Sequence, residues 1–193
     1  MKTKLISAIV AATAVLLTAG VTYAAFSDTG KVLGSSFSVG SADLKLLKDP
    51  AGGLINENLA DEMAGPAFMN IGPNWKKDYA IKIYNNATGK VQIATNANYL
   101  TTNDPDDLRS VIYVEPVLWS DGNNNGVVDA GEESTSFGKK TITKWKTEGF
   151  DLGQVDSGSV KGLVLRFSTD SLSDTKQGKS GIFDFEFDSI TVE

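Results

Sequence analysis

The segment GIFDFEFDSITVE, residues 181–193, alternates apolar and acidic side chains with a period of two. Its two faces carry Phe183, Phe185 and Phe187 on one side and Asp184, Glu186 and Asp188 on the other. Successive side chains of an extended chain point to opposite faces, so this pattern is typical of a strand with one buried and one solvated face. The segment predicts a β-strand that packs phenylalanines into a core.

The same alternation recurs along the chain and no long helical stripe interrupts it. The segments that share it are DYAIKIYNN (78–86), KVQIATNA (90–97), SVIYVEPVLW (110–119) and GLVLRFSTD (162–170). Pro116 is expected to end or bulge its strand, because proline cannot donate to a sheet ladder. Turn-rich connections separate these segments. Together, the short alternating segments and the turns between them predict an all-β, antiparallel jelly roll or β-sandwich, with short helices in the loops at 54–64 and 104–110.

The segment SSFSVGSADLKLL, residues 35–47, changes phase in its middle. Phe37 and Val39 share one face, and the apolar positions then slip to Ala42, Leu44 and Leu46. A single strand absorbs one extra residue in a β-bulge. We therefore expect a bulge at residues 40–41.

The first residues resemble a secretory signal peptide. Lys2 and Lys4 precede an apolar run from residue 5 to 17, and Thr22 and Ala24 occupy the −3 and −1 positions of a cleavage site. The alternative is a retained membrane anchor, but a spanning helix needs about 20 apolar residues, and polar residues interrupt this run. We expect cleavage after residue 24, export to the extracellular space and no stable membrane anchor.

Composition excludes several classes of function. The chain has 193 residues, no Cys and no His, so it contains no disulfide framework, no Ser-His-Asp triad and no ordinary zinc cage. The formal net charge is −6, and loss of the two signal-peptide lysines would make it −8. A nucleic-acid partner is not expected from such a charge. The sequence favours a protein that is not an enzyme.

The segment DGNNNGVVDAGE, residues 121–132, has the spacing of an EF-hand calcium loop. The expected Ca²⁺ ligands are Asp121, Asn123, Asn125, the main-chain carbonyl of Val127, Asp129 and Glu132. Gly126 stands at the sixth position, where the chain must turn sharply. The alternative is an Asn/Gly turn that binds no metal. The flanking segments, 109–120 and 133–145, are both predicted as strands rather than helices, so we expect the loop to be a structural clip and not a signalling device.

The start of the mature chain resembles the TasA/camelysin family, which is exported by a SipW-type signal peptidase. The matching residues are Ala25, Phe26, Ser27 and Asp28, then Phe37, Gly40, Asp43 and Leu44. The middle segment NIGPNWKKDYAIKIYNNATGKVQI, residues 70–93, is also similar, and residues 181–189 are weakly so. The resemblance covers these parts only.

The resemblance implies a jelly-roll subunit of an extracellular biofilm or pilus-like filament. The parts would be a signal peptide (1–24), a donor-strand segment (25–36) and a β-sandwich domain (37–193). Donor residues Ala25, Phe26, Val32 and Leu33 would enter a neighbouring copy of the chain, so the partner is the protein itself in a head-to-tail polymer. A segment this polar packs poorly on its own, and strand addition at an open sheet edge makes filaments.

Two other functions remain open from the sequence. A monomeric secreted adhesin or carbohydrate-binding module would use the calcium loop together with exposed aromatic side chains, although core packing is the ordinary role of such residues. The family resemblance also implies a metallopeptidase, which the absence of His disfavours. The sequence Asn86-Ala87-Thr88 is a glycosylation sequon at an expected turn.

Overall fold

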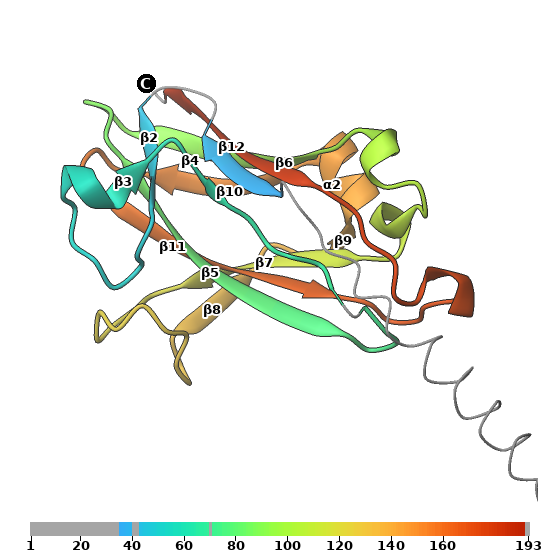
Figure 1. Ribbon diagram of the computed structural model, residues 1–193. Helices are drawn as coiled ribbons and strands as arrows, with labels where there is room; N and C mark the ends of the chain where they lie inside the picture. The colour runs from blue at the N-terminus through green and yellow to red at the C-terminus, as the bar shows by residue number, and fades with distance from the viewer. Residues whose placement is uncertain (1–34, 40–42, 70, 192–193) are drawn as a thin grey trace, which may run out of the picture.

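The computed structural model describes residues 35–39, 43–69 and 71–191. The predicted signal peptide and the four donor residues named above lie outside these ranges. The described chain forms two β-sheets that face each other as a sandwich, with β12, β6 and β10 in one layer and β5, β11, β7 and β8 in the other (Figure 1). The all-β sandwich expected from the alternating segments is confirmed.

The five-stranded sheet contains the strand predicted from the alternation at residues 181–193. In spatial order its strands are β10 (Phe150–Val155), β6 (Val91–Asn98), β12 (Asp184–Thr191), β1 (Ser36–Val39) and β4 (Glu62–Ala64). Phe183, Phe185 and Phe187 are fully buried, as their spacing predicts. The β1–β12 pairing is parallel, whereas the other pairings in this sheet are antiparallel, so the sheet is mixed.

The seven-stranded sheet forms the opposite layer. Along its path lie β3 (Leu59–Ala60), β2 (Leu44–Leu47), β5 (Lys76–Asn85), β11 (Val160–Ser168), β7 (Tyr113–Trp119) and β8 (Glu133–Ser136), and β9 (Lys140–Thr141) also pairs with β7. Pro116 does not end β7, because it pairs with Leu165 of β11 in an unbroken register. The irregularity lies on the β8 side, between Val117 and Trp119.

The phase slip near residue 40 marks a change of sheet rather than a bulge. β1 belongs to the five-stranded sheet and β2 to the seven-stranded sheet. Phe37 therefore enters the core from one layer, and Leu44 and Leu46 enter it from the other. The expectation of one bulged strand was wrong, because a sandwich lets a chain bury both phases by crossing between layers.

The helices of the described residues are short. They are the 3₁₀ turns η1 (Asn56–Asn58), η2 (Thr101–Asn103), η3 (Leu108–Ser110) and η4 (Asp174–Lys176) and the α-helix α2 (Ile142–Glu148). The expectation of a strand that continues to residue 145 was wrong. Instead Thr141 caps a helix, with its hydroxyl accepting a hydrogen bond from Lys144 N at 3.2 Å, and Ile142 and Trp145 are buried. No described helix is long and apolar enough to span a membrane.

Candidate calcium-binding loop

The loop of residues 121–132 connects β7 to β8, as the flanking strand patterns predict. A main-chain hydrogen bond from Ser120 N to Glu132 O, at 2.9 Å, closes its base. The strand before the loop is anchored in the sheet by Trp119, whose side chain is buried. The loop is therefore an excursion from the edge of the seven-stranded sheet, at the lower left of Figure 1.

The first half of the loop is organised by side-chain oxygens that accept main-chain N–H groups. Asp121 Oδ1 accepts from Asn125 N at 3.1 Å and Oδ2 accepts from Gly126 N at 2.9 Å. Asn123 Oδ1 also accepts from Asn125 N, at 3.0 Å. Asn125 Oδ1 accepts from Val127 N at 2.7 Å. Three of the predicted ligand side chains thus turn their oxygens towards the same short stretch of backbone.

Glycine is required at position 126 by the sharp turn and also by a close contact with the main chain. Its φ of +72° is one that L residues rarely adopt, and a Cβ placed on it would lie 2.6 Å from Ala51 N. The loop therefore rests directly against the main chain at residue 51, in the connection between β2 and η1. The sharp turn was predicted from the motif, whereas this contact was not.

Asp129 joins the two amides. Its Oδ2 accepts hydrogen bonds from Asn123 Nδ2 at 2.9 Å and from Asn125 Nδ2 at 2.8 Å. The side chain of Val127 is exposed, so only the main chain of this residue can contribute to a site inside the loop. The structure therefore brings Asp121, Asn123, Asn125 and Asp129 into one hydrogen-bonded group.

Glu132 closes the loop from its last position. Its Oε1 accepts from Gly122 N, and its Oε2 accepts from Asp129 N and from Trp119 Nε1, each at 3.0 Å. The Trp119 hydrogen bond is the main cause of a lowered pKa for Glu132, followed by the main-chain N–H of Asp129. This carboxylate is held in its charged form, which is the form that a metal ion needs.

Asp121 is charged for a related reason. Lys82 Nζ lies 2.8 Å from Asp121 Oδ2, and this hydrogen bond is the main cause of the lowered pKa of Asp121, ahead of the Gly126 and Asn125 N–H groups. A cationic group thus already contacts the first predicted ligand. The donor set of the loop, made of carboxylate, amide and carbonyl oxygens, is of the type that a hard cation such as Ca²⁺ prefers.

The loop's ligand set is mixed, and calcium remains a prediction. Within residues 35–39, 43–69 and 71–191, no group of three or more His, Cys, Asp or Glu residues is arranged as a metal site. The predicted site instead combines three carboxylates with two amides and one carbonyl, and its residues are held together by the hydrogen bonds described above.

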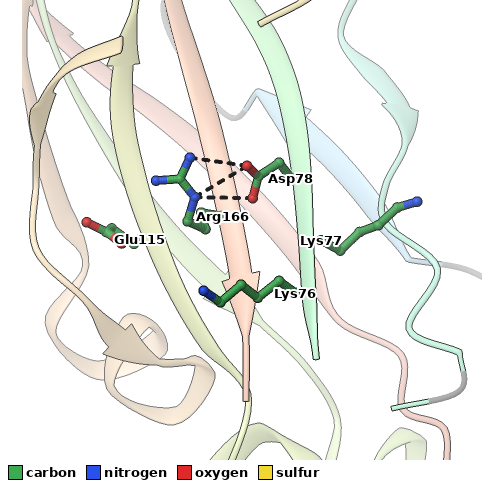
Figure 2. A pocket seen from close by; sticks show the side chains of 5 residues that line it. All are labelled: Lys76, Lys77, Asp78, Glu115 and Arg166. Atoms are coloured by element: carbon green, nitrogen blue, oxygen red, sulfur yellow. Dashed lines mark hydrogen bonds and ion pairs between the residues drawn. The ribbon is translucent and has the colours of Figure 1, made fainter. Parts of the chain in front are cut away.

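A second surface feature is an open depression of about 520 Å³ on the outer face of the seven-stranded sheet. Figure 2 shows its lining residues, among which Arg166 of β11 is hydrogen-bonded to Asp78 of β5. The Arg166 guanidinium also lies 2.8 Å from Glu133 of β8. The hydrogen bond to Asp78 is the main cause of a raised pKa for Arg166, so the centre of this depression is an ion-paired surface.

Five of the tryptophan and tyrosine residues pack into the sandwich, whereas Tyr84 and Tyr113 are partly exposed. Trp119 and Trp145 are buried, and Trp75, Tyr79 and Tyr99 are half-buried against the core. Trp145 donates its indole N–H to Thr95 O at 3.0 Å. These side chains therefore serve packing, as is ordinary for large aromatic residues in a sandwich.

Comparisons with known proteins give little beyond the fold. No protein-family model matches the chain, and no curated protein matches it. Among solved structures, it is similar to an ASH/PapD-like domain of human CEP192 (PapD-like domain 7), with 10% sequence identity and a TM-score of 0.28. That match covers 79% of this chain and 89% of the other. The fold class itself is established by the two sheets described above.

Proposed function

We propose that the chain is a secreted, non-enzymatic subunit of an extracellular filament, assembled by donor-strand complementation and stiffened by a calcium loop. The residues before Ser35, from Ala25 onward, would leave one copy and pair with a sheet of the next. The resemblance to the TasA/camelysin family motivates the proposal. The structure supports it through an exposed apolar side chain near the end of β12.

The observation that carries the proposal is an exposed apolar side chain near the end of β12. Ile190 is 68% exposed, more than any other large apolar side chain of the described chain. Its strand pairs with β6 along all eight residues and with β1 from Asp184 to Phe187. A donor strand from a second copy that packs beside this end of the sheet would cover Ile190. Main-chain hydrogen bonds would supply affinity and the side chains would set the register.

The described chain is held in its own sheet from Ser35 onward. Ser35 O accepts from Gly65 N at 3.0 Å, and Ser36 N donates to Asp184 Oδ1 at 3.1 Å. Ser35 and Ser36, which belong to the donor segment expected from the sequence, are therefore held in the five-stranded sheet of their own subunit. The proposed donor is accordingly residues 25–34, which immediately precede Ser35 in the chain.

Electron microscopy of the mature protein with calcium tests the proposal. We expect fibres, whereas a monomeric adhesin would give discrete particles. Deletion of residues 25–34 should abolish the fibres, and the shortened protein should bind a synthetic peptide of that sequence but not a scrambled one. Fibres that persist after the deletion would contradict donor-strand assembly.

A matched pair of substitutions localises the acceptor. Ile190→Ser should weaken fibre formation, because it removes the apolar side chain that the added strand would cover. Leu100→Ser is the control, since Leu100 is 66% exposed and lies outside the five-stranded sheet. If both variants assemble equally well, the acceptor does not lie next to Ile190.

A further inference from the structure

Lys82 is positioned by a row of three residues across the seven-stranded sheet. Gly162 of β11 pairs with Lys82 of β5 on one side and with Trp119 of β7 on the other. A Cβ on Gly162 would lie 2.4 Å from Trp119 O and 3.3 Å from the indole ring. Because the middle residue has no side chain, Lys82 reaches across β11, and its ammonium lies 5.2 Å from the centre of the Trp119 ring.

The ammonium group of Lys82 contacts the predicted calcium loop. It donates to Asp121 Oδ2 at 2.8 Å and to Pro50 O at 2.7 Å. The side chains of Lys82 and Asp121 are only 12% and 1% exposed, so water screens their attraction weakly. Asp121 stands at the first position of the loop, where the motif places a metal ligand. A positive charge is thus fixed at the carboxylate that a calcium ion would need.

We propose that Lys82 is a tethered competing cation that sets the affinity and charge selectivity of the loop, a role that rests on the calcium-binding part of the proposed function. Without metal, the ammonium neutralises Asp121. A calcium ion bound to Asp121 would have to share this carboxylate with the ammonium or displace it. Both cost binding free energy, because like charges repel and a largely buried ammonium would lose its partner. The site is therefore weak and fills only where calcium is abundant.

The same contact excludes singly charged ions. Sodium or potassium at Asp121 would replace one unit of positive charge with another and gain little electrostatic energy. A divalent ion brings one additional unit of charge to a loop with three carboxylates. Lys82 therefore makes the loop selective for divalent ions, and it links ion binding to the main chain at Pro50.

Calorimetric titration of the purified protein with calcium chloride tests this inference. Lys82→Met keeps most of the aliphatic stem against Trp119 but removes the charge, so calcium should bind at least tenfold more tightly than to the parent. Lys82→Arg keeps the charge and should bind calcium no more tightly than the parent. Lys76→Met is the matched control. It removes one charge from the same face of β5, six residues and about 20 Å away, and should leave the affinity unchanged.

The outcomes separate this inference from the calcium proposal. If the parent binds calcium and Lys82→Met, folded by circular dichroism, binds no more tightly, the competing role is wrong while the calcium loop stands. If only Lys82→Met binds, Lys82 is confirmed as the competing cation and the parent loop is not a calcium clip. If neither binds, both ideas are wrong. An equal gain in Lys76→Met would also overturn the inference, because the effect would then be one of net charge.

Discussion

The indole ring of Trp145 stacks on the phenyl ring of Phe185, with ring centroids 4.6 Å apart and planes inclined by 11°. Trp145 belongs to α2 and Phe185 to the centre of β12. The same phenyl ring lies 5.5 Å from those of Phe37 and Phe167, which come from the two different sheets. This aromatic group therefore joins the helix to both layers of the sandwich.

Trp145→Ala should lower the free energy of unfolding by about 3–5 kcal/mol, because it leaves a large cavity in a closed core. Trp145→Phe should cost less, since it keeps an aromatic ring but loses the hydrogen bond to Thr95 O. Urea denaturation of the two variants measures both values. Equal losses would show that the hydrogen bond, and not the ring volume, dominates.

Gly126→Ala should destabilise the protein more than Gly131→Ala. Both glycines have positive φ, and that strain costs a non-glycine residue about 1–2 kcal/mol. Only at Gly126 would the new methyl group also meet Ala51 N, at 2.6 Å, whereas the space at Gly131 is open. Thermal unfolding of the two variants compares them. Equal shifts in Tm would mean that the loop can move away from residue 51 at no cost.

Asp188→Asn should raise the Tm at pH 7 by about 1–2 °C. Burial, and then the nearby charge of Glu186, raise the pKa of Asp188 above its ordinary value of 3.8. Because the folded state binds this proton more tightly than the unfolded state, protonation of Asp188 stabilises the fold below the unfolded-state pKa. This stabilisation is lost as the pH rises through the folded-state pKa. The gain from Asn should therefore vanish below about pH 3.8. Asp184→Asn is the control, because Asp184 accepts two hydrogen bonds from Ser36 and its loss should not stabilise.

The double variant Lys140→Met/Lys161→Met should self-associate. Lys140 Nζ donates to Gly149 O, immediately before the edge strand β10, at 2.6 Å, and Lys161 Nζ donates to Leu152 O within that strand. Lysine at an edge strand opposes pairing with other chains. Sedimentation velocity should show larger species for this variant and not for Lys76→Met/Lys144→Met, which removes two exposed lysines elsewhere. Identical profiles would show that β10 is closed by other means.

Chelation of calcium should lower the Tm with little change in the far-ultraviolet circular dichroism. At a free calcium concentration ten times the Kd, binding stabilises the folded state by about 1.4 kcal/mol, which corresponds to about 4 °C. Glu132→Gln should lose most of this response, because it removes the last predicted ligand. Glu133→Gln, one residue further along, should keep it. If the Tm of the parent protein does not change when chelator is added, the loop is not a calcium-dependent structural clip.

The strands could be predicted from the sequence because each carries its own alternation. The pattern at 181–193 identified β12 and its three buried phenylalanines, and those at 78–86 and 162–170 identified β5 and β11. The change of sheet between β1 and β2 could not be predicted, since a phase slip looks the same in a bulge and in a change of layer. Helix α2 was missed because seven residues are too few to show a helical period.

The calcium-loop motif could be recognised from the sequence because all of its positions lie within twelve consecutive residues. The contact made by Lys82 could not be recognised, although its segment was correctly predicted as a strand. Its contact with Asp121 depends on the register of β5, β11 and β7 and on the absence of a side chain at Gly162. Pairings between distant segments of this kind cannot be read from a single sequence.

The position of β1 has a mechanical consequence. β1 is hydrogen-bonded to β12 on one side and to β4 on the other. A force applied at Ser35 along the strand would load both ladders in shear, so many bonds would have to break together rather than unzip one after another. The sheet would therefore resist a pulling force on Ser35 best when the force is directed along β1.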